Sequence, residues 1–106
     1  MINTDQIPSG IRIACIGEAM IELSSIDLEQ HLARLAVAGD AYNPAVYLQR
    51  ELGRVNGSVD FFTAVGSDAL SDAKIEEFQR EELGADLVQR HATRLPGIYN
   101  INLDLV

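Results

Sequence analysis

The sequence predicts an α/β fold, in which helices pack on a largely parallel sheet. Two apolar runs, residues 11–17 (IRIACIG) and 59–66 (VDFFTAVG), both end in glycine. Continuous apolar character is typical of a strand that is buried on both faces. A helical pattern follows each run further along the chain, and two strand–helix units in succession favour one sheet with right-handed crossovers.

Length and composition restrict the class of protein. A chain of 106 residues with 47% hydrophobic residues fits one small packed domain or a piece of a larger one. The net charge of −8, with eight scattered basic residues, argues against a nucleic-acid partner. The single cysteine, Cys15, allows no disulfide within the chain, which favours a reducing cytoplasm. We expect no membrane association, because no signal sequence or membrane-length apolar run is visible.

The amino-terminal half begins with a polar segment. Residues 1–10 contain Pro and Gly and are expected to form a flexible arm before the strand at 11–17. Residues 20–24 (MIELS) alternate in character, which predicts a half-exposed strand. Residues 32–38 (LARLAVA) fit either a short strand or a helical turn.

The segment from Ala41 to about Leu52 has the period of a helix, and Gly53 is its predicted end. The predicted buried face holds three residues: Ala45, Leu48 and Leu52. The opposite face holds Gln49, Arg50 and Glu51.

The carboxyl-terminal half contains the clearest helix, residues 67–84, with Ser67 or Asp68 as the N-cap and Gly84 as its end. Residues 86–90 predict a short strand. Residues 98–106 alternate and predict a strand with Ile101, Leu103 and Leu105 on one face. Because the chain stops inside this pattern, we expect further chain to follow.

Polar residues lie where an α/β sheet binds its ligands, at the carboxyl ends of the strands. Glu18 follows the first strand, and Gly39, Asp40 and Asn43 open the first helix. These groups suit the hydroxyls of a polyol. The residues alone favour a simpler interpretation, with Asn43 as N-cap and Pro44 as the first helical residue. His31 and His91 lack the spacing of metal ligands, so no metal site is predicted.

Four segments resemble the amino-terminal part of the ribokinase/PfkB carbohydrate kinases. They are CIGEAMIELS (15–24), AGDAYNPAVYLQRELG (38–53), FFTAVGSDALSD (61–72) and LVQRHATRLPGIYNINLD (87–104). Within the family, GEAMIELS and RLPGIY are most similar to the branch that phosphorylates 2-keto-3-deoxygluconate. The spacer between Ala45 and Gly53 is one residue longer than the usual family signature.

The resemblance implies a sugar site. Gly39, Asp40 and Asn43 would contact sugar hydroxyls, with the backbone of Ala41 and Tyr42 between them. Two further residues would face the same pocket: Tyr99, on a lid strand, and Glu18, where relatives often have Asp. With the family in view, the ligand role of Asn43 takes precedence over the cap.

The resemblance also implies a three-layer α/β fold with a small β-sheet lid, built from strands near 20–24, 32–38 and 97–105. Residues 11–106 would then form the amino-terminal part of a ribokinase-like domain. Lid strands often pair between subunits in this family, so a homo-oligomer is expected.

ATP and Mg²⁺ are the implied cosubstrate and metal. The family's catalytic base is the aspartate of a G-A-G-D motif, which these 106 residues do not contain. We therefore expect no catalytic residue in this chain and no turnover by it alone. Two alternatives remain, a fructokinase- or ribokinase-type kinase and an inactive truncated polypeptide that acts as an interaction module.

Overall fold

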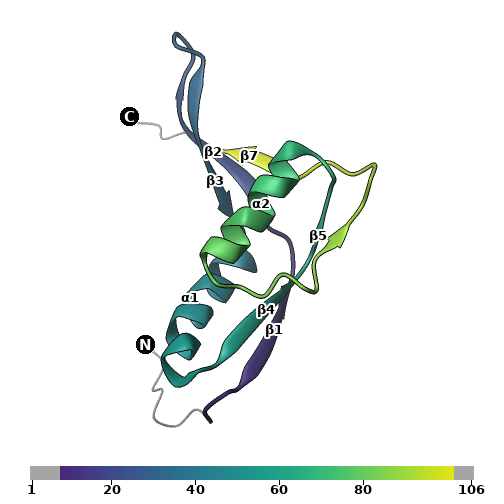
Figure 1. The fold of residues 1–106 in the computed structure, drawn as a ribbon. Coiled ribbons are helices and arrows are strands. Elements are labelled where there is room, and N and C mark those ends of the chain that lie inside the picture. Colours follow the sequence, from purple (N-terminus) through teal and green to yellow (C-terminus); the bar gives the residue numbers. More distant parts are fainter. Residues whose placement is uncertain (1–7, 102–106) are drawn as a thin grey trace.

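A computed structural model of the protein describes residues 8–101 and confirms the α/β class (Figure 1). The elements in this part of the chain are β1 (Arg12–Ile16), β2 (Met20–Asp27), β3 (Leu32–Ala38), α1 (Tyr42–Leu52), the 3₁₀ turn η2 (Gly53–Val55), β4 (Ser58–Phe62), β5 (Ala64–Val65), α2 (Ala69–Arg80), β6 (Gln89–Arg90) and β7 (Ile98–Asn100).

Strands β1 and β4 form a parallel pair, in register from Arg12↔Ser58 to Ile16↔Phe62. One face of the pair is covered by α1 and α2, and there Val59 and Phe61 are fully buried. The prediction of burial on both faces is wrong for the part of the chain that the structure describes. Ile16 is 73% exposed on the opposite face, because no described element packs against it.

The apolar run 59–66 is not one strand. It breaks at Thr63, and β5 continues in a different sheet by pairing in parallel with β6. The Thr63 carbonyl at the break accepts a hydrogen bond from the Gln89 amide at 2.9 Å. The run 59–66 therefore contributes one strand to each of two sheets, and its continuous apolar character does not indicate this division.

Strands β2, β3 and β7 form a separate three-stranded sheet in the order β3-β2-β7. The segment 32–38 is thus a strand, antiparallel to β2, and not a helical turn. β7 pairs with β2 in parallel. The β2–β3 hairpin projects from the rest of the protein (Figure 1). Residues 102–106, part of the last predicted strand, lie outside the described residues.

Three aromatic rings lie at the centre of the core. Tyr42 of α1, Phe61 of β4 and Phe78 of α2 have ring centroids 5.3–5.9 Å apart, in edge-to-face or tilted pairs. All three side chains are buried, at 4% exposure or less. Each ring comes from a different element, so this cluster joins both helices to the β1–β4 pair.

Helix α1 differs from its prediction in the burial of one residue. Gln49, predicted on the solvent side, is only 7% exposed, and its Oε1 accepts a hydrogen bond from the Val59 amide at 2.7 Å. The α-helix ends at Leu52 with Gly53 at the C-cap, as predicted, although Gly53 keeps helical backbone angles and the chain continues into η2. The chain turns at Asn56, whose φ of 57° is left-handed, a conformation that Asn tolerates better than most residues.

Helix α2 has the predicted N-cap at Asp68, whose carboxylate accepts hydrogen bonds from the Leu70 and Ser71 amides. Its predicted end at Gly84 is wrong. The helix ends at Arg80, and Glu82 adopts a left-handed φ of 62°. Gly84 instead forms a β-bridge with Asp60.

The end of the predicted arm is in contact with the rest of the protein. The Ser9 hydroxyl and the Gly10 amide each donate a hydrogen bond to the Val55 carbonyl, both at 3.2 Å. These bonds hold residues 9–10 beside η2. Residues 1–7 lie outside the described part of the chain.

Candidate functional site

A hollow of about 440 Å³ lies where the end of β1 meets the start of α1. We call it the Gly39 hollow. Its lining residues are Glu18, Met20, Gly39, Asp40, Ala41 and Tyr99. The structure thus brings together five of the seven residues predicted for the sugar site, from three separate segments of the chain.

Two glycines allow the end of β1 and the start of α1 to approach each other this closely. A Cβ atom on Gly39, whose φ is 156°, would lie 2.7 Å from the Glu18 carbonyl oxygen. A Cβ on Gly17 would lie 2.2 Å from the Cβ of Ala41. Both distances are shorter than real Cβ contacts, so any side chain would push the two segments apart.

The prediction that Asn43 caps the first helix is wrong. Helix α1 begins at Tyr42 with Ala41 at the N-cap position, and no side chain caps it. Asn43 is the second helical residue, and its amide donates to the Gly39 carbonyl at 3.0 Å. The exposed side chain of Asn43 does not cap the helix. Gly39, Asp40 and Ala41, which directly precede α1, line the Gly39 hollow, so the positive end of the helix dipole lies beside that hollow.

Tyr42 and Asn43, the other two predicted residues, line a neighbouring hollow that also contains Glu22 and Arg50. The Tyr42 side chain is part of the aromatic core, and burial raises its pKa to about 12. Tyr42 can therefore reach the Gly39 hollow only through its backbone. Asn43 lies beside that hollow and is not among its lining residues.

Tyr99 is positioned by a hydrogen bond between strands. Its hydroxyl donates to Oε1 of Glu22 at 2.8 Å, and the two residues are direct partners in the β7–β2 pairing. This hydrogen bond raises the pKa of Tyr99 above its ordinary value. The aromatic ring is thereby held against the Gly39 hollow by the three-stranded sheet.

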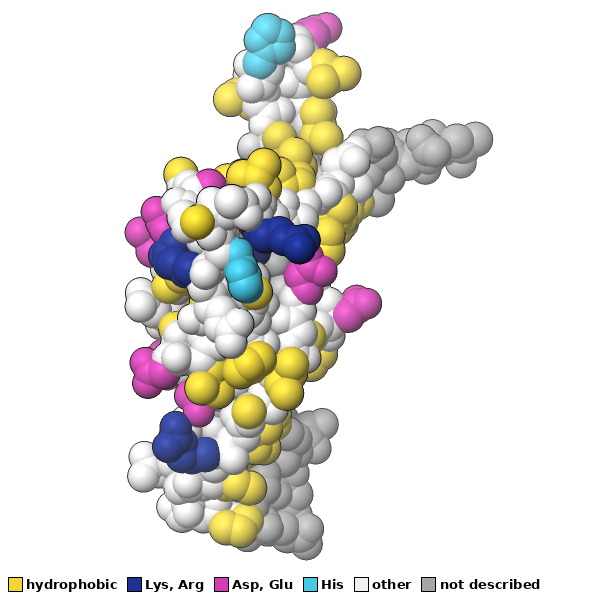
Figure 2. All heavy atoms as spheres, turned by 90° about the vertical axis from the view of Figure 1, so that its right-hand side faces the viewer, with side chains coloured by type: hydrophobic (Ala, Val, Ile, Leu, Met, Phe, Trp, Pro, Cys, Tyr) yellow, Lys and Arg dark blue, Asp and Glu magenta, His cyan; other side chains and the backbone are white. Residues whose placement is uncertain are grey.

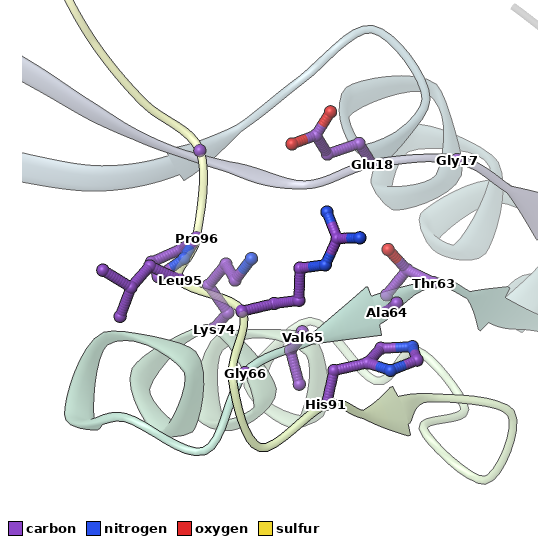
Figure 3. A pocket seen from close by; sticks show the side chains of 12 residues that line it. Gly17, Glu18, Thr63, Ala64, Val65, Gly66, Lys74, His91, Leu95 and Pro96 are labelled. Atoms are coloured by element: carbon purple, nitrogen blue, oxygen red, sulfur yellow. The ribbon is translucent and has the colours of Figure 1, made fainter.

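Sequence reasoning missed a second hollow, of about 500 Å³, which we call the Lys74 hollow (Figure 3). It lies at the carboxyl ends of β1 and β4 and shares Glu18 with the Gly39 hollow. Its lining residues are Gly17, Glu18, Thr63, Ala64, Val65, Gly66, Lys74, His91, Arg94, Leu95, Pro96 and Gly97.

Lys74 is the most unusual side chain of this second hollow. It is 2% exposed, and its Nζ donates a hydrogen bond to the Ala19 carbonyl at 3.0 Å. Burial lowers the pKa of Lys74, while the negative charges of Glu18 and Asp68 oppose that change. The spacing of Lys74 from Phe78 places both on the buried face of α2, a signal that could have been found in the sequence.

Within residues 8–101, no group of three His, Cys, Asp or Glu side chains could hold a metal ion. No helix in the same part of the chain is long and apolar enough to cross a membrane. The Glu18 and Asp40 carboxylates, the Tyr99 side chain and the buried Lys74 amine line the two hollows, and groups of these kinds bind hydroxyls and small anions.

Comparison with known proteins identifies the family. Residues 11–104 match the model of the pfkB family carbohydrate kinases. The 2-dehydro-3-deoxygluconokinase of Dickeya dadantii is 39% identical over 94 residues, and that of Escherichia coli K12 is 36% identical over 93. These matches cover 87–88% of this chain and 29% of each relative, so the chain spans less than a third of their length.

Solved structures show the same fold. A fructokinase with bound ATP from Xylella fastidiosa matches with a TM-score of 0.74 and 27% identity, over 88% of this chain and 27% of that one. A 2-dehydro-3-deoxygluconokinase from Thermotoga maritima matches with a TM-score of 0.71 and 22% identity, over 85% of this chain and 27% of that one.

Proposed function

The chain belongs to the pfkB family of carbohydrate kinases, and from this premise we propose that it is the sugar-binding part of an ATP-dependent kinase. The proposed full reaction transfers a phosphoryl group to the 6-hydroxyl of 2-keto-3-deoxygluconate. The main structural support is the Gly39 hollow, in which two carboxylates and a tyrosine from distant segments surround one space.

Each side chain in this hollow has a proposed task. Asp40 and Glu18 accept hydrogen bonds from sugar hydroxyls, and Asn43 at the edge supplies an amide. Tyr99 lies over the sugar on the sheet β3-β2-β7, which acts as the lid. Closure of such a lid excludes water and fixes the acceptor hydroxyl in one orientation.

The choice of a sugar acid rests on the curated relatives, which share the name 2-dehydro-3-deoxygluconokinase and are 32–39% identical to this chain. The 2-dehydro-3-deoxygluconate in that enzyme name and 2-keto-3-deoxygluconate are the same compound. A fructokinase-type substrate is the second candidate, because a fructokinase structure is 27% identical and shares the fold.

The phosphoryl-transfer groups are not assigned to this chain. The described residues provide no cluster of carboxylates that fits Mg²⁺, and the sequence contains no G-A-G-D motif. The proposed contribution of these residues is to bind and orient the acceptor sugar, and we expect the chain alone to bind without turnover.

Self-association through the lid sheet is a further part of the proposal. Leu28, Leu32 and Leu35 of the β2–β3 hairpin are exposed, which favours contact with a second copy. Light scattering after size-exclusion chromatography should show a dimer or larger species. Acidic substitution of Leu32 should shift it to a monomer if the hairpin is the contact.

Isothermal titration calorimetry with three sugars tests the choice of substrate. We expect saturable binding of 2-keto-3-deoxygluconate, and weaker binding of fructose and ribose. Replacing Asp40 by Ala should weaken the binding of all three, because they share the hydroxyl-binding groups. Tighter binding of fructose would instead support the fructokinase alternative, and the absence of any sugar binding would contradict the proposed function.

A further inference from the structure

Within residues 8–101, three connections join the sheet β3-β2-β7 to the rest of the protein, and they meet at one place. They run from β1 to β2, from β3 to α1 and from β6 to β7. A Cβ atom on Gly39, in the second connection, would lie 2.7 Å from the carbonyl oxygen of Glu18, in the first. A Cβ atom on Gly97, in the third, would lie 2.8 Å from Glu18 Oε1. Glu18, Gly39 and Gly97 are therefore packed together, and we call this place the lid junction.

Lys74, on the buried face of α2, is bonded to the lid junction. It is only 2% exposed, and its Nζ donates a hydrogen bond to the Ala19 carbonyl at 3.0 Å. Ala19 directly follows Glu18 and is fully buried. A buried amine and a buried carbonyl both need a partner, so the bond stabilises both groups. It also fixes α2 to the connection between β1 and β2.

The charges around Lys74 leave Glu18 as the carboxylate that its ammonium group can orient. Glu18 and Asp68 both favour the charged form of the amine. His91 and Arg94, from the connection between β6 and β7, line the same hollow as Lys74 (Figure 3). In Figure 2, basic side chains and a histidine lie together on one face of the molecule. Asp68 is occupied as the N-cap of α2. Glu18 lines both hollows and forms no ion pair within the described part of the chain.

We propose that Lys74 is a positioning residue of the sugar site, which fixes the lid junction through the Ala19 carbonyl and thereby places Glu18 against the sugar. This inference rests on the proposed function and deepens it, and Lys74 itself contacts no sugar. The hydrogen bond fixes the backbone next to Glu18. The positive charge attracts the Glu18 carboxylate to the place where the two hollows meet, and Gly97 leaves the space that this carboxylate occupies.

A double-mutant cycle tests whether Lys74 acts through Glu18. Lys74→Met keeps the length of the side chain but removes both the donor and the charge. It should lower the affinity for 2-keto-3-deoxygluconate and for fructose by the same factor, about three- to tenfold, because Glu18 accepts from a hydroxyl of either sugar. In a Glu18→Gln background, the same change should alter either affinity by less than about twofold.

Two further variants serve as rescue and control. Lys74→Arg retains a charged donor, and the adjoining hollow of about 500 Å³ gives room for the guanidinium group. It should recover most of the affinity that Lys74→Met loses, because a charge-assisted hydrogen bond remains possible. Arg34→Met is the matched control, since Arg34 is exposed on β3 and lines neither the Gly39 hollow nor the Lys74 hollow. It should leave both sugar affinities unchanged.

Lys74 is the only lysine of the chain, so its charge can be followed directly. Protein labelled with ¹³C at lysine Cε has one lysine signal, which titrates with Lys74. Burial lowers the pKa of Lys74, so the midpoint should lie below the ordinary 10.5. As the pH rises through this midpoint, the amide signals of Glu18 and Ala19 should shift and the sugar affinity should fall, because the charge that attracts Glu18 is lost. Neither change should occur in Lys74→Met.

The outcomes separate this role from the function on which it rests. If the wild type binds sugar but Lys74→Met has the same effect with and without the Glu18 carboxylate, the positioning role is contradicted and the sugar site stands. The same conclusion follows if the Glu18 and Ala19 amides do not titrate with the lysine signal, and this measurement on the wild type decides the question even if Lys74→Met does not fold. If the wild type binds neither sugar, the proposed function fails, and the positioning role fails with it.

Discussion

Gly39 lies against the backbone of Glu18, so closely that a Cβ atom at Gly39 would be 2.7 Å from the Glu18 carbonyl oxygen. This contact joins the end of β1 to the start of α1 and sets the shape of the Gly39 hollow. It links a local feature of the sequence, one glycine before a helix, to the position of two candidate sugar-binding carboxylates, Glu18 and Asp40.

Gly39→Ala should therefore disturb both stability and the site. We expect the free energy of unfolding to fall by about 1–3 kcal/mol, because the new methyl group meets the carbonyl and the backbone is strained. Sugar affinity should fall more than tenfold. Gly53→Ala is the control: its φ is −57° and its nearest neighbour would be 3.8 Å away, so it should be neutral or slightly stabilising in urea denaturation. If Gly39→Ala and Gly53→Ala were equally stable, the close approach of Gly39 to the Glu18 carbonyl would not restrict the side chain at position 39.

Gln49→Met should destabilise the protein without affecting sugar binding. The Gln49 Oε1 atom is the acceptor for the buried Val59 amide at 2.7 Å, and methionine offers no comparable acceptor. An unpaired buried amide costs about 1–3 kcal/mol, which urea denaturation would detect. Gln79→Met, at an exposed position of α2, should change stability by less than about 0.5 kcal/mol. If both variants behave alike, the bond to Val59 does not stabilise the fold.

Tyr99→Phe should weaken sugar binding while leaving the fold intact. The change removes the hydroxyl that donates to Glu22 at 2.8 Å, so the ring is no longer fixed against the sheet. Calorimetry should show an affinity about three- to tenfold lower, in the range of one typical intramolecular hydrogen bond, because the bond to Glu22 acts on the sugar only by positioning the ring. Tyr47→Phe, at an exposed tyrosine outside the Gly39 hollow, serves as the control. A loss of the same size in both variants would argue against a role for Tyr99.

The pH dependence of stability should report the burial of Lys74. Its pKa is lowered in the folded protein, so at a pH between that value and the ordinary 10.5 the unfolded chain binds more protons. Stability should therefore rise with pH through this window, relative to Lys74→Met. The pKa of Tyr42 is raised to about 12, so Tyr42 contributes stability that is lost as the pH rises above 10. This contribution is present in both the wild type and Lys74→Met, so it cancels when the stability of one is subtracted from that of the other. If the difference in unfolding free energy between the wild type and Lys74→Met did not change with pH, the burial of the Lys74 ammonium group would be contradicted.

Much of the fold follows from local patterns in the sequence. The alternation of MIELS, the apolar run before Gly17 and the Asp68 cap predict β2, β1 and the start of α2 correctly, because each depends on neighbours within a few residues. Of the five predicted residues that line the Gly39 hollow, Glu18, Gly39 and Asp40 are indicated by their places at a strand end and a helix start, whereas Ala41 and Tyr99 come from the family resemblance. Their meeting in one place depends on contacts between distant segments that no local pattern contains.

The errors have a common physical origin in long-range packing. Thr63 breaks an apolar run because β5 pairs with β6 rather than with β1. Gln49 is buried because a distant backbone amide needs an acceptor there. Asn43 is not the cap, because its own amide already donates to the Gly39 carbonyl and the helix begins one residue earlier, at Tyr42. Lys74 was overlooked because a lysine within a charged helix is usually exposed.

The central claim is that these residues form a sugar-acid site, and amide chemical-shift mapping by NMR tests it most directly. Titration of ¹⁵N-labelled protein with 2-keto-3-deoxygluconate should produce saturable shifts at Gly39, Asp40, Ala41 and Tyr99, with the shifts lost in Asp40→Ala. Contradiction would come from shifts confined to other surfaces, such as the exposed face of β1 and β4, or from no saturable shift at any amide.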